Sequence, residues 1–439
     1  MSEPLVAGTL VIGALLGLMA MGMPIAFALG FVSIMALLLT QGLGMMSILG
    51  ETFFSGLATF GLVSIPMFIL MGAAVASSPA GRDLYEALDR WLNRVPGSLV
   101  LSNIGACSIF AALSGSSPAT CAAIGKMGIP EMVRRGYPKE IAAGSIAAGG
   151  TLGILIPPSV TMIVYGIATE TSIGRLFLAG LLPGFMLTGL FMLWTIIDCR
   201  RRGFRFEAAA VRFSLRERLA ALPRILPFLA IIVAVLYVLY GGIATPSEAA
   251  GVGAVFCLVF VVLIYRMWNP RPLMKVFNDA LKESVMIMMI IAASELFAFT
   301  LSSLFVTQSI AGWIADLEIN RWVLLLIVNL FLLLAGCFLP PVAIILMSAP
   351  ILIPIITQAG FDPYWFAVVL TINMEIGLIT PPVGLNLYVI NGIAPDITLQ
   401  QILWGSLPYA LCMVLGILLL CLFPAIATWL PNLMMGHGA

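Results

Sequence analysis

Long apolar stretches separated by short polar turns run along the chain from end to end. Examples that contain no Asp, Glu, Lys or Arg are 4–50, 52–81, 95–125, 141–169, 176–197 and 322–361. Most are long enough for one or two membrane helices of roughly 20 residues. The runs are continuous and do not alternate in ~10-residue segments, so the pattern predicts about ten to twelve hydrophobic helical segments and not a β-barrel.

Composition strengthens the membrane interpretation. Of the 439 residues, 61% are hydrophobic and 9% are charged, and the mean hydropathy is +1.12. A soluble domain could not hide this much apolar surface, so we expect an all-α polytopic membrane protein. Seven cysteines without a CxxC pair and a single histidine, His437, argue against a metal centre or disulfide framework. An intramembrane enzyme would need a nucleophile paired with a base, and a chain with one histidine and few acids in its apolar stretches offers no convincing pair.

Basic residues are confined to the middle of the chain. All 21 Lys and Arg lie between Arg82 and Arg321, and the densest group occupies residues 200–224. The positive-inside rule assigns this Arg-rich connector to the cytoplasm. Both chain ends lack basic residues, which predicts that they lie on the opposite side. The start, MSEPLVAG, has no basic n-region and is interpreted as the beginning of the first helix, not as a cleaved signal peptide.

The two halves of the chain resemble each other. At an offset of 224 positions, without a gap, the identical pairs include Ala119 and Ala343, Ile129 and Ile353, Pro130 and Pro354, Gly136 and Gly360, Gly153 and Gly377, Pro157 and Pro381, and Pro158 and Pro382. Repeats at 1–199 and 225–439 that meet at one cytoplasmic connector, 200–224, each cross the membrane an odd number of times. They are therefore predicted to be inverted, as in secondary transporters. Duplication in a membrane protein that transports nothing is the alternative.

Four short segments interrupt the helices, two in each half. In the first half these are SGSSP at 114–118 and GILIPPS at 153–159; their counterparts are FLPPV at 338–342 and GLITPPVG at 377–384. Glycine and proline at 114–118 leave helical arms too short to span ~30 Å, so this segment and 338–342 are interpreted as tips of re-entrant hairpins. Adjacent prolines remove two N–H donors, so the other two segments are interpreted as broken helices.

These interruptions predict binding sites. Non-helical backbone at membrane depth is tolerated where it is buried in protein or lines a watery cavity. A tip facing a break can surround a cation with oxygens, while helix N-termini present N–H groups to an anion. We expect two pseudosymmetric Na⁺ sites with an anionic substrate between the tips. Candidate oxygen ligands are Ser114, Ser116, Ser117, Thr151, Ser159, Thr380 and Asn386, of which Ser116, Ser117, Ser159 and Asn386 are also candidates for substrate contact. Close helix packing is the alternative role for each single serine.

Other polar positions have more specific interpretations. Glu375 stands alone before the second break and is a candidate for ion binding, with a structural or interfacial role as the alternative. Thr245 and Glu248 form a capping box that opens a helix. Charges at 82–94 have helical spacing, which predicts an amphipathic segment at the membrane surface, and 132–140 predicts a polar turn.

Several motifs, in order along the chain, resemble the large membrane subunit of tripartite ATP-independent periplasmic (TRAP) transporters. They are FAALSGSSPATCAAIG, GGTLGILIPPS, YGIATETSIGRLFLAGLLPG, TPSEAAGVGA and GLITPPVGLNLYV. The resemblance covers nearly the whole chain. It implies a Na⁺-coupled importer of a small organic acid anion, such as a C4-dicarboxylate, a sugar acid such as sialic acid, or a sulfonate, that works by an elevator movement.

The resemblance also implies partners and a location. The partners are a small four-helix membrane subunit and a soluble periplasmic substrate-binding protein, and the location is the bacterial inner membrane. Na⁺ is implied as the coupling ion, without a cofactor. Because the chain begins at the first large-subunit helix, the small subunit is expected to be a separate polypeptide.

By the same resemblance, the residues of each sodium site can be assigned. The first site would comprise Ser114, Gly115, Ser116, Ser117, Thr151, Gly153, Pro157, Pro158 and Ser159. The second would comprise Gly336, Phe338, Pro340, Glu375, Gly377, Thr380, Pro381, Pro382 and Gly384. Many relatives carry an acidic residue in the second tip, where this chain has Pro340, so the second site departs from the family pattern. A stand-alone Na⁺- or H⁺-coupled transporter using Glu375 is the runner-up, and a channel would need a repeated pore ring, which the sequence lacks.

Overall fold

The computed structural model describes residues 3–93, 95–202, 213–316 and 319–436. Part of the connector, 203–212, with Arg205 and Arg212, lies outside these residues, as does His437. Within the described ranges every regular element is a helix, which confirms the all-α fold class. In the part of the chain that the structure describes, five helices are long and apolar enough to cross a membrane, and the number of spans is seven if each of two bent helix pairs counts as one. Five further apolar helices are shorter.

The helices follow the chain in two series. The first series is α1 (Glu3–Ala20), α2 (Ile25–Gln41), α3 (Met46–Leu57), α4 (Ser64–Ala76), α5 (Ala80–Leu92), α6 (Ser98–Ser114), α7 (Ser117–Arg134), α8 (Lys139–Thr151), α9 (Val160–Ala168) and α10 (Ile173–Arg201). The second series is α11 (Leu215–Tyr240), α12 (Pro246–Tyr265), α13 (Pro270–Ser303), α14 (Val306–Asp316), α15 (Arg321–Gly336), α16 (Pro341–Gln358), α17 (Pro363–Leu378), α18 (Leu385–Ile393), α19 (Leu399–Leu422) and α20 (Ala425–Met435).

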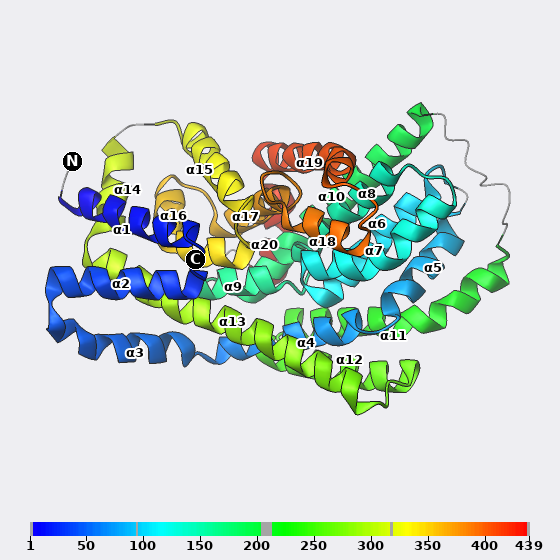
Figure 1. The fold of residues 1–439 in the computed structure, drawn as a ribbon, viewed down its shortest axis with the longest axis horizontal. Helices are drawn as coiled ribbons and strands as arrows, with labels where there is room; N and C mark the ends of the chain where they lie inside the picture. The colour runs from blue at the N-terminus through cyan, green and yellow to red at the C-terminus, as the bar shows by residue number, and fades with distance from the viewer. Residues whose placement is uncertain (1–2, 94, 203–212, 317–318, 437–439) are drawn as a thin grey trace.

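These helices form two groups. We call α1–α4 with α11–α13 the framework, because α13 packs on α2, α3 and α4, and α12 packs on α4. We call α6–α9 with α15–α18 the tip domain, in which α7 contacts α6, α8 and α18, and α16 contacts α9 and α17. In Figure 1, framework helices α2, α3, α4, α12 and α13 run along the lower side, and α15, α17 and α18 lie above them. The two groups are built from helices of both halves of the sequence.

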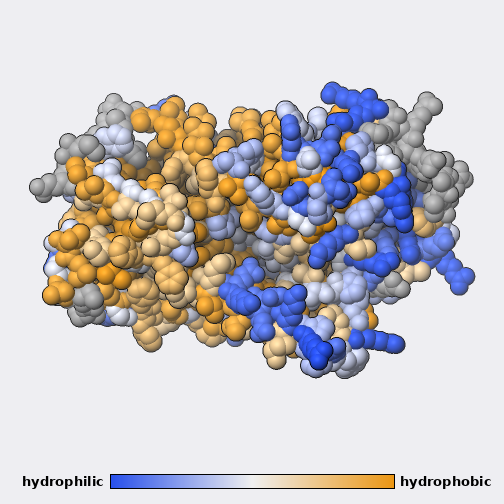
Figure 2. Space-filling view, in the orientation of Figure 1, coloured by the Kyte–Doolittle hydropathy of each residue, from blue (hydrophilic) through white to orange (hydrophobic). Residues whose placement is uncertain are grey.

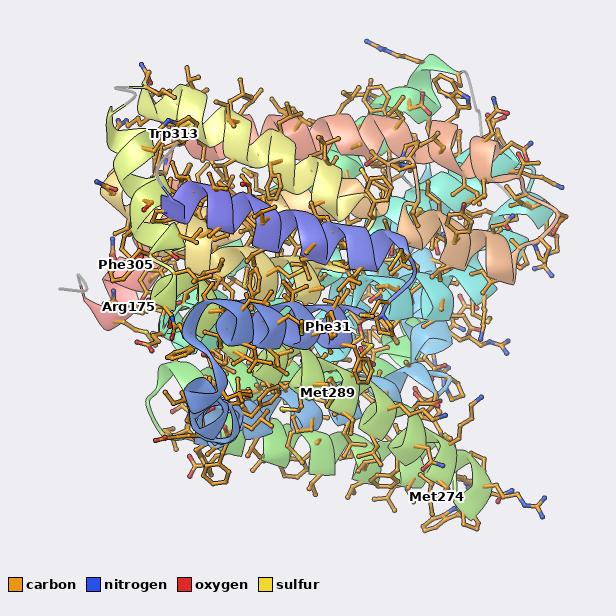
Figure 3. The ribbon with its side chains drawn as sticks, turned by 60° about the vertical axis from the view of Figure 1, so that its left-hand side comes forward. Phe31, Arg175, Met274, Met289, Phe305 and Trp313 are labelled. Atoms are coloured by element: carbon orange, nitrogen blue, oxygen red, sulfur yellow. The ribbon has the colours of Figure 1, made fainter. Side chains whose placement is uncertain are left out.

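The outer surface has a polar end and a broad apolar wall. Figure 2 shows hydrophilic residues gathered toward the right-hand end, where α5 and α7 lie. The rest of the visible face is mostly hydrophobic. Side chains such as Phe31 on α2 and Met274 on α13 point outward in Figure 3 and are 52% and 60% exposed. An apolar wall of this extent on the framework matches a lipid-facing surface.

The polar segments take the local structures that the sequence predicts. Helix α5 is amphipathic, with an Arg82–Glu86 ion pair of 2.7 Å one turn apart. Burial raises the pKa of the Asp89 carboxyl on this helix, against the opposing effect of Arg135 at 3.3 Å. The capping box at Thr245 is confirmed, since its side chain accepts from the Glu248 backbone N–H at 3.3 Å. The polar turn between α7 and α8 is also confirmed, with residues 135–138 outside both helices.

Backbone contact fixes α8 against α19. Gly144 of α8 and Gly405 of α19 lie so close that a methyl group at either would overlap backbone atoms of the other helix. A Cβ at Gly405 would collide with the Glu140 carbonyl oxygen. Small residues permit this close approach of the two helices. In lipid, where no hydrophobic effect drives helices together, the resulting van der Waals contacts stabilise the helix pair.

We expect Gly405→Ala to destabilise the protein, because the new methyl group must separate α8 from α19. Overpacking of this kind costs roughly 1–3 kcal/mol or more. The measurement is the thermal unfolding midpoint and the monodisperse yield of purified protein in detergent. Gly189→Ala in α10, where the structure leaves the added Cβ free of any atom within 4 Å, is the matched control and should behave as the wild type. Equal stability of the two variants would contradict the contact.

Candidate functional site

The first tip is a sharp break between α6 and α7. Helix α6 ends at Ser114, and Gly115 adopts a left-handed conformation with φ of 59°, which glycine accepts without the steric penalty of a side chain. Ser116 is the N-cap of α7, and its carbonyl oxygen accepts from the Thr120 hydroxyl at 2.9 Å. The Ser114 and Thr120 hydroxyls are 2.8 Å apart. The tip is thus held by hydrogen bonds among its own polar groups.

The first break lies directly against this tip. Helix α8 ends at Thr151, a 3₁₀ turn covers Leu152–Ile154, and α9 begins at Val160. A Cβ at Gly115 would lie 3.2 Å from the Pro158 carbonyl oxygen. A Cβ at Gly153 would in turn lie 3.5 Å from the Ser116 carbonyl oxygen. The backbones of tip and break are therefore in close contact inside the protein.

Two hydroxyls of the first predicted site are already engaged. Ser159 caps α9, where its side chain accepts from the Met162 N–H at 3.3 Å. The Thr151 hydroxyl donates back to its own helix and lies 3.7 Å from the Met413 sulfur of α19. Both residues lie beside the break, but their hydroxyls serve local structure in this arrangement.

The second tip and break repeat this contact. Helix α15 ends at Gly336, Pro340 is the N-cap of α16, and the Gly384 N–H donates to the Cys337 carbonyl oxygen at 3.4 Å. A Cβ at Gly377 would lie 2.7 Å from the Gly336 carbonyl oxygen, so α15 and α17 touch through their backbones. The Thr380 hydroxyl lies 3.5 Å from the Cys337 sulfur and donates to the helix carbonyl one turn earlier.

The two breaks differ in exposure. Pro157 and Pro158 are buried, whereas Pro381 and Pro382 are exposed; the peptide bond within each pair is cis. Phe338 at the second tip is 61% exposed. Proline has no backbone N–H. Two adjacent prolines therefore reduce the number of N–H groups that would lack a hydrogen-bond acceptor where irregular backbone lies in an apolar environment.

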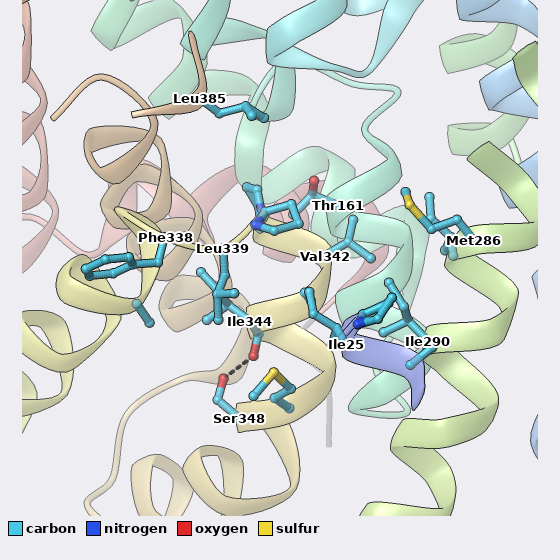
Figure 4. Close-up of a pocket in the computed structure, with 18 of the residues that line it drawn as sticks. Ile25, Thr161, Met286, Ile290, Phe338, Leu339, Val342, Ile344, Ser348 and Leu385 are labelled. Carbon is cyan, nitrogen blue, oxygen red and sulfur yellow. Dashed lines mark hydrogen bonds between the residues drawn. The ribbon is translucent and has the colours of Figure 1, made fainter. Parts of the chain in front are cut away.

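Both tips line one large cavity, of about 1510 Å³, between the tip domain and the framework. Figure 4 shows Phe338, Leu339 and Val342 of the second tip facing it, with Thr161 of α9 across from them. Ile25 at the start of α2 and Met286 and Ile290 of α13 form the framework wall. The lining from the first tip consists of Ser114, Gly115, Ser116, Ser117, Pro118 and Ala119. The predicted substrate residues Ser159 and Asn386 do not line it.

Glu375 has a different neighbour from the one the sequence suggested. The sequence grouped it with the second site, but its Oε2 accepts a hydrogen bond of 2.7 Å from the Ser117 hydroxyl of the first tip. Asn386 likewise reaches the first half, where its amide donates to the Ala147 carbonyl oxygen at 3.2 Å. Sequence spacing along one helix does not identify a neighbour 258 positions away, so the sequence did not predict this hydrogen bond.

The cavity contains residues that sequence reasoning missed. Thr161 and Glu283 are polar lining residues from α9 and α13. Thr161 follows the first break by two positions, and this closeness to the break could have marked it in the sequence as a candidate cavity residue. Glu283 lies in a helix with other charges near its start, which hid it among surface positions.

Comparisons with known proteins agree with this architecture. Residues 12–426 match the model of the family described as "Tripartite ATP-independent periplasmic transporter, DctM component". The C4-dicarboxylate TRAP transporter large permease protein of Pseudomonas aeruginosa is 42% identical over 84% of this chain and 86% of its own. Its counterpart from Rhodobacter capsulatus is 36% identical over 97% of this chain and 99% of its own.

A solved structure shares the fold. The YdaH transporter of Alcanivorax borkumensis superposes with a TM-score of 0.64 over 89% of each chain, at 18% sequence identity. The family match covers most of the chain, and it includes both tips and both breaks. The chain therefore belongs to the TRAP transporter family as a large permease component.

Proposed function

We propose that this permease imports a small organic acid anion across the bacterial inner membrane, coupled to Na⁺ that binds where each tip meets its break. The observation that carries the proposal is the single cavity lined by both tips, each of which packs on its own broken helix. Helix ends leave carbonyl groups without partners in their own helix, and hard cations take oxygen ligands.

The first sodium site is the better defined. Its proposed ligands lie among the backbone and hydroxyl oxygens of Ser114–Ser117 and the 153–159 break, except the Ser117 hydroxyl, which donates to Glu375. The backbones of the two segments are close together, at Gly115 beside Pro158 and at Gly153 beside Ser116. The second site would use the Gly336–Pro340 tip with the 377–384 break. The close backbone contact of Gly336 with Gly377 supports a compact second site.

The anion would lie between the tips. Ser116 can supply a hydroxyl group to the cavity, and α7 and α16 both begin at its wall. Helix N-termini favour negative charge, so these two ends can hold a carboxylate without a basic side chain. C4-dicarboxylates are the first substrates to test, because the two relatives above are named for them.

Partners and movement follow from the family. The tripartite name implies a small membrane subunit and a periplasmic binding protein that delivers the substrate. The two halves are proposed to be inverted repeats, with the Arg-rich connector cytoplasmic and the termini periplasmic. The tip domain would slide against the framework as an elevator, since the cavity lies between these two groups. A stand-alone Na⁺- or H⁺-coupled transporter is the competing proposal.

Reconstituted transport tests the function. The permease, with the small subunit in proteoliposomes, should accumulate labelled succinate when binding protein and an inward Na⁺ gradient are both present. Omission of either should reduce uptake to the protein-free background. Full uptake by the permease alone without Na⁺ would contradict the proposal and favour the stand-alone alternative.

Ser116→Ala should weaken Na⁺ dependence, because it removes a hydroxyl group from a first-tip residue that lines the cavity and whose side chain makes no capping hydrogen bond. Loss of one oxygen ligand from the ion should raise the half-saturating Na⁺ concentration about tenfold, which is equivalent to about 1.4 kcal/mol. Uptake measured against Na⁺ concentration gives this value. Ser145→Ala is the control, since that buried hydroxyl bonds only within α8, to Ala142. An unchanged Na⁺ curve for Ser116→Ala would remove this residue from the site.

Gly377→Ala should impair transport more than it impairs folding. The methyl group would push α17 away from Gly336 and separate the second break from its tip. We expect at least a roughly tenfold loss of uptake, a value equivalent to about 1.4 kcal/mol and within the usual cost of overpacking. Gly392→Ala in α18, with nothing within 4 Å of the added Cβ, is the matched control. Wild-type uptake in Gly377→Ala would show that the contact is dispensable.

A further inference from the structure

One hydrogen bond joins the first tip to the helix that precedes the second break. The Ser117 hydroxyl donates to Glu375 Oε2 at 2.7 Å across 258 positions of sequence. Ser117 is fully buried and Glu375 is 1% exposed. In such a low-dielectric setting, a hydrogen bond to a carboxyl group is strong and its loss is costly. The relative positions of these two segments are therefore tied together.

Each end of this bond is fixed to a tip. Ser117 is the first residue of α7 and follows Ser116, the N-cap residue at the first tip. Glu375 precedes Gly377 by two residues on α17, and Gly377 touches Gly336 at the end of α15. A short, rigid path thus runs from one tip to the other through α17.

The Ser117 hydroxyl is the one described hydrogen-bond donor to this carboxyl group. Among the described residues, Glu375 Oε1 has no partner. If the first tip moves and Ser117 withdraws, the buried carboxyl group loses its hydrogen bond and pays the desolvation cost in full. The energy of Glu375 therefore depends on the position of the first tip.

A second contact connects the broken helices themselves. Asn386 of α18, just after the second break, donates to the Ala147 carbonyl oxygen of α8, just before the first. Asn386 is fully buried. The two halves thus meet at paired polar contacts, and of these the Ser117–Glu375 bond is the one that reaches a tip.

We propose that Glu375 is a positioning residue that couples the two sites: through Ser117 it makes the arrangement of the first tip depend on that of the second break. Occupation of one site then favours occupation of the other. Such coupling is a free energy shared by both sites, and it appears as positive cooperativity. The inference rests on the proposed Na⁺ coupling, and it assigns to Glu375 neither ion ligation nor contact with the substrate.

The test compares Na⁺ titrations of succinate uptake in proteoliposomes with the small subunit and binding protein. The variants are Ser117→Ala, Glu375→Met and the double substitution, since methionine keeps the approximate volume and removes the acceptor. Each single substitution should lower the Na⁺ Hill coefficient toward 1 and raise the half-saturating Na⁺ concentration at least about fivefold, the lower end of typical coupling. The double substitution should add nothing, because both remove one bond.

Controls separate coupling from stability and from ligation. Ser117→Thr keeps the hydroxyl and should retain the cooperativity that Ser117→Ala loses, and Ser145→Ala should leave the titration unchanged. Glu375 does not line the cavity, so matching changes at both positions identify their bond as the cause. If Glu375→Met fails to fold, the Hill coefficients of Ser117→Ala and Ser117→Thr are compared instead, and equal values for the two variants would contradict the coupling.

The outcomes are distinct. Uptake by the wild type that does not respond to Na⁺ would overturn the proposed function, and the coupling with it. A cooperative wild type whose variants keep its Hill coefficient and lose only thermal stability would overturn the coupling alone and make the bond purely structural. Additive effects in the double substitution would also overturn it.

Discussion

The structure depends on how irregular backbone is accommodated inside an apolar protein. Each helix interruption frees N–H and carbonyl groups that lipid cannot satisfy. The chain brings the interruptions of each half together: residues 114–118 lie against 153–159, and residues 336–337, just before the second tip, lie against 377–384. Glycine at the contacts lets carbonyl groups approach, and proline removes donors that would otherwise lack acceptors.

This constraint acts on geometry more than on side-chain identity. The YdaH transporter keeps the fold at 18% identity, with a TM-score of 0.64. What the pairing demands is a residue that can turn, such as Gly115 or Gly384 at positive φ, and a backbone that can come close. Side chains are then free to differ at the cavity wall, as the apolar second tip differs from the hydroxyl-rich first tip.

Pairing the interruptions also connects distant parts of the chain. Because tips and breaks meet near one another, a residue of α17 can bond to the start of α7, as Glu375 does to Ser117. The same arrangement places both tips on one cavity beside the framework. A binding cavity, and contacts that cross between the halves, thus follow from the way the polar backbone is buried.

The sequence by itself determined the membrane class, the family, the four interruptions and the capping box at Thr245. These depend on composition, on proline and glycine, and on spacings of a few residues, which act locally on the backbone. Only the tertiary structure decided the partner of Glu375, the burial of Pro157 against the exposure of Pro381, and the absence of Ser159 and Asn386 from the cavity wall. Those properties depend on which helices are neighbours and on how each helix is rotated about its own axis. That is set by the packing of segments far apart in the chain, and the apolar pattern of a buried helix is too uniform to specify it.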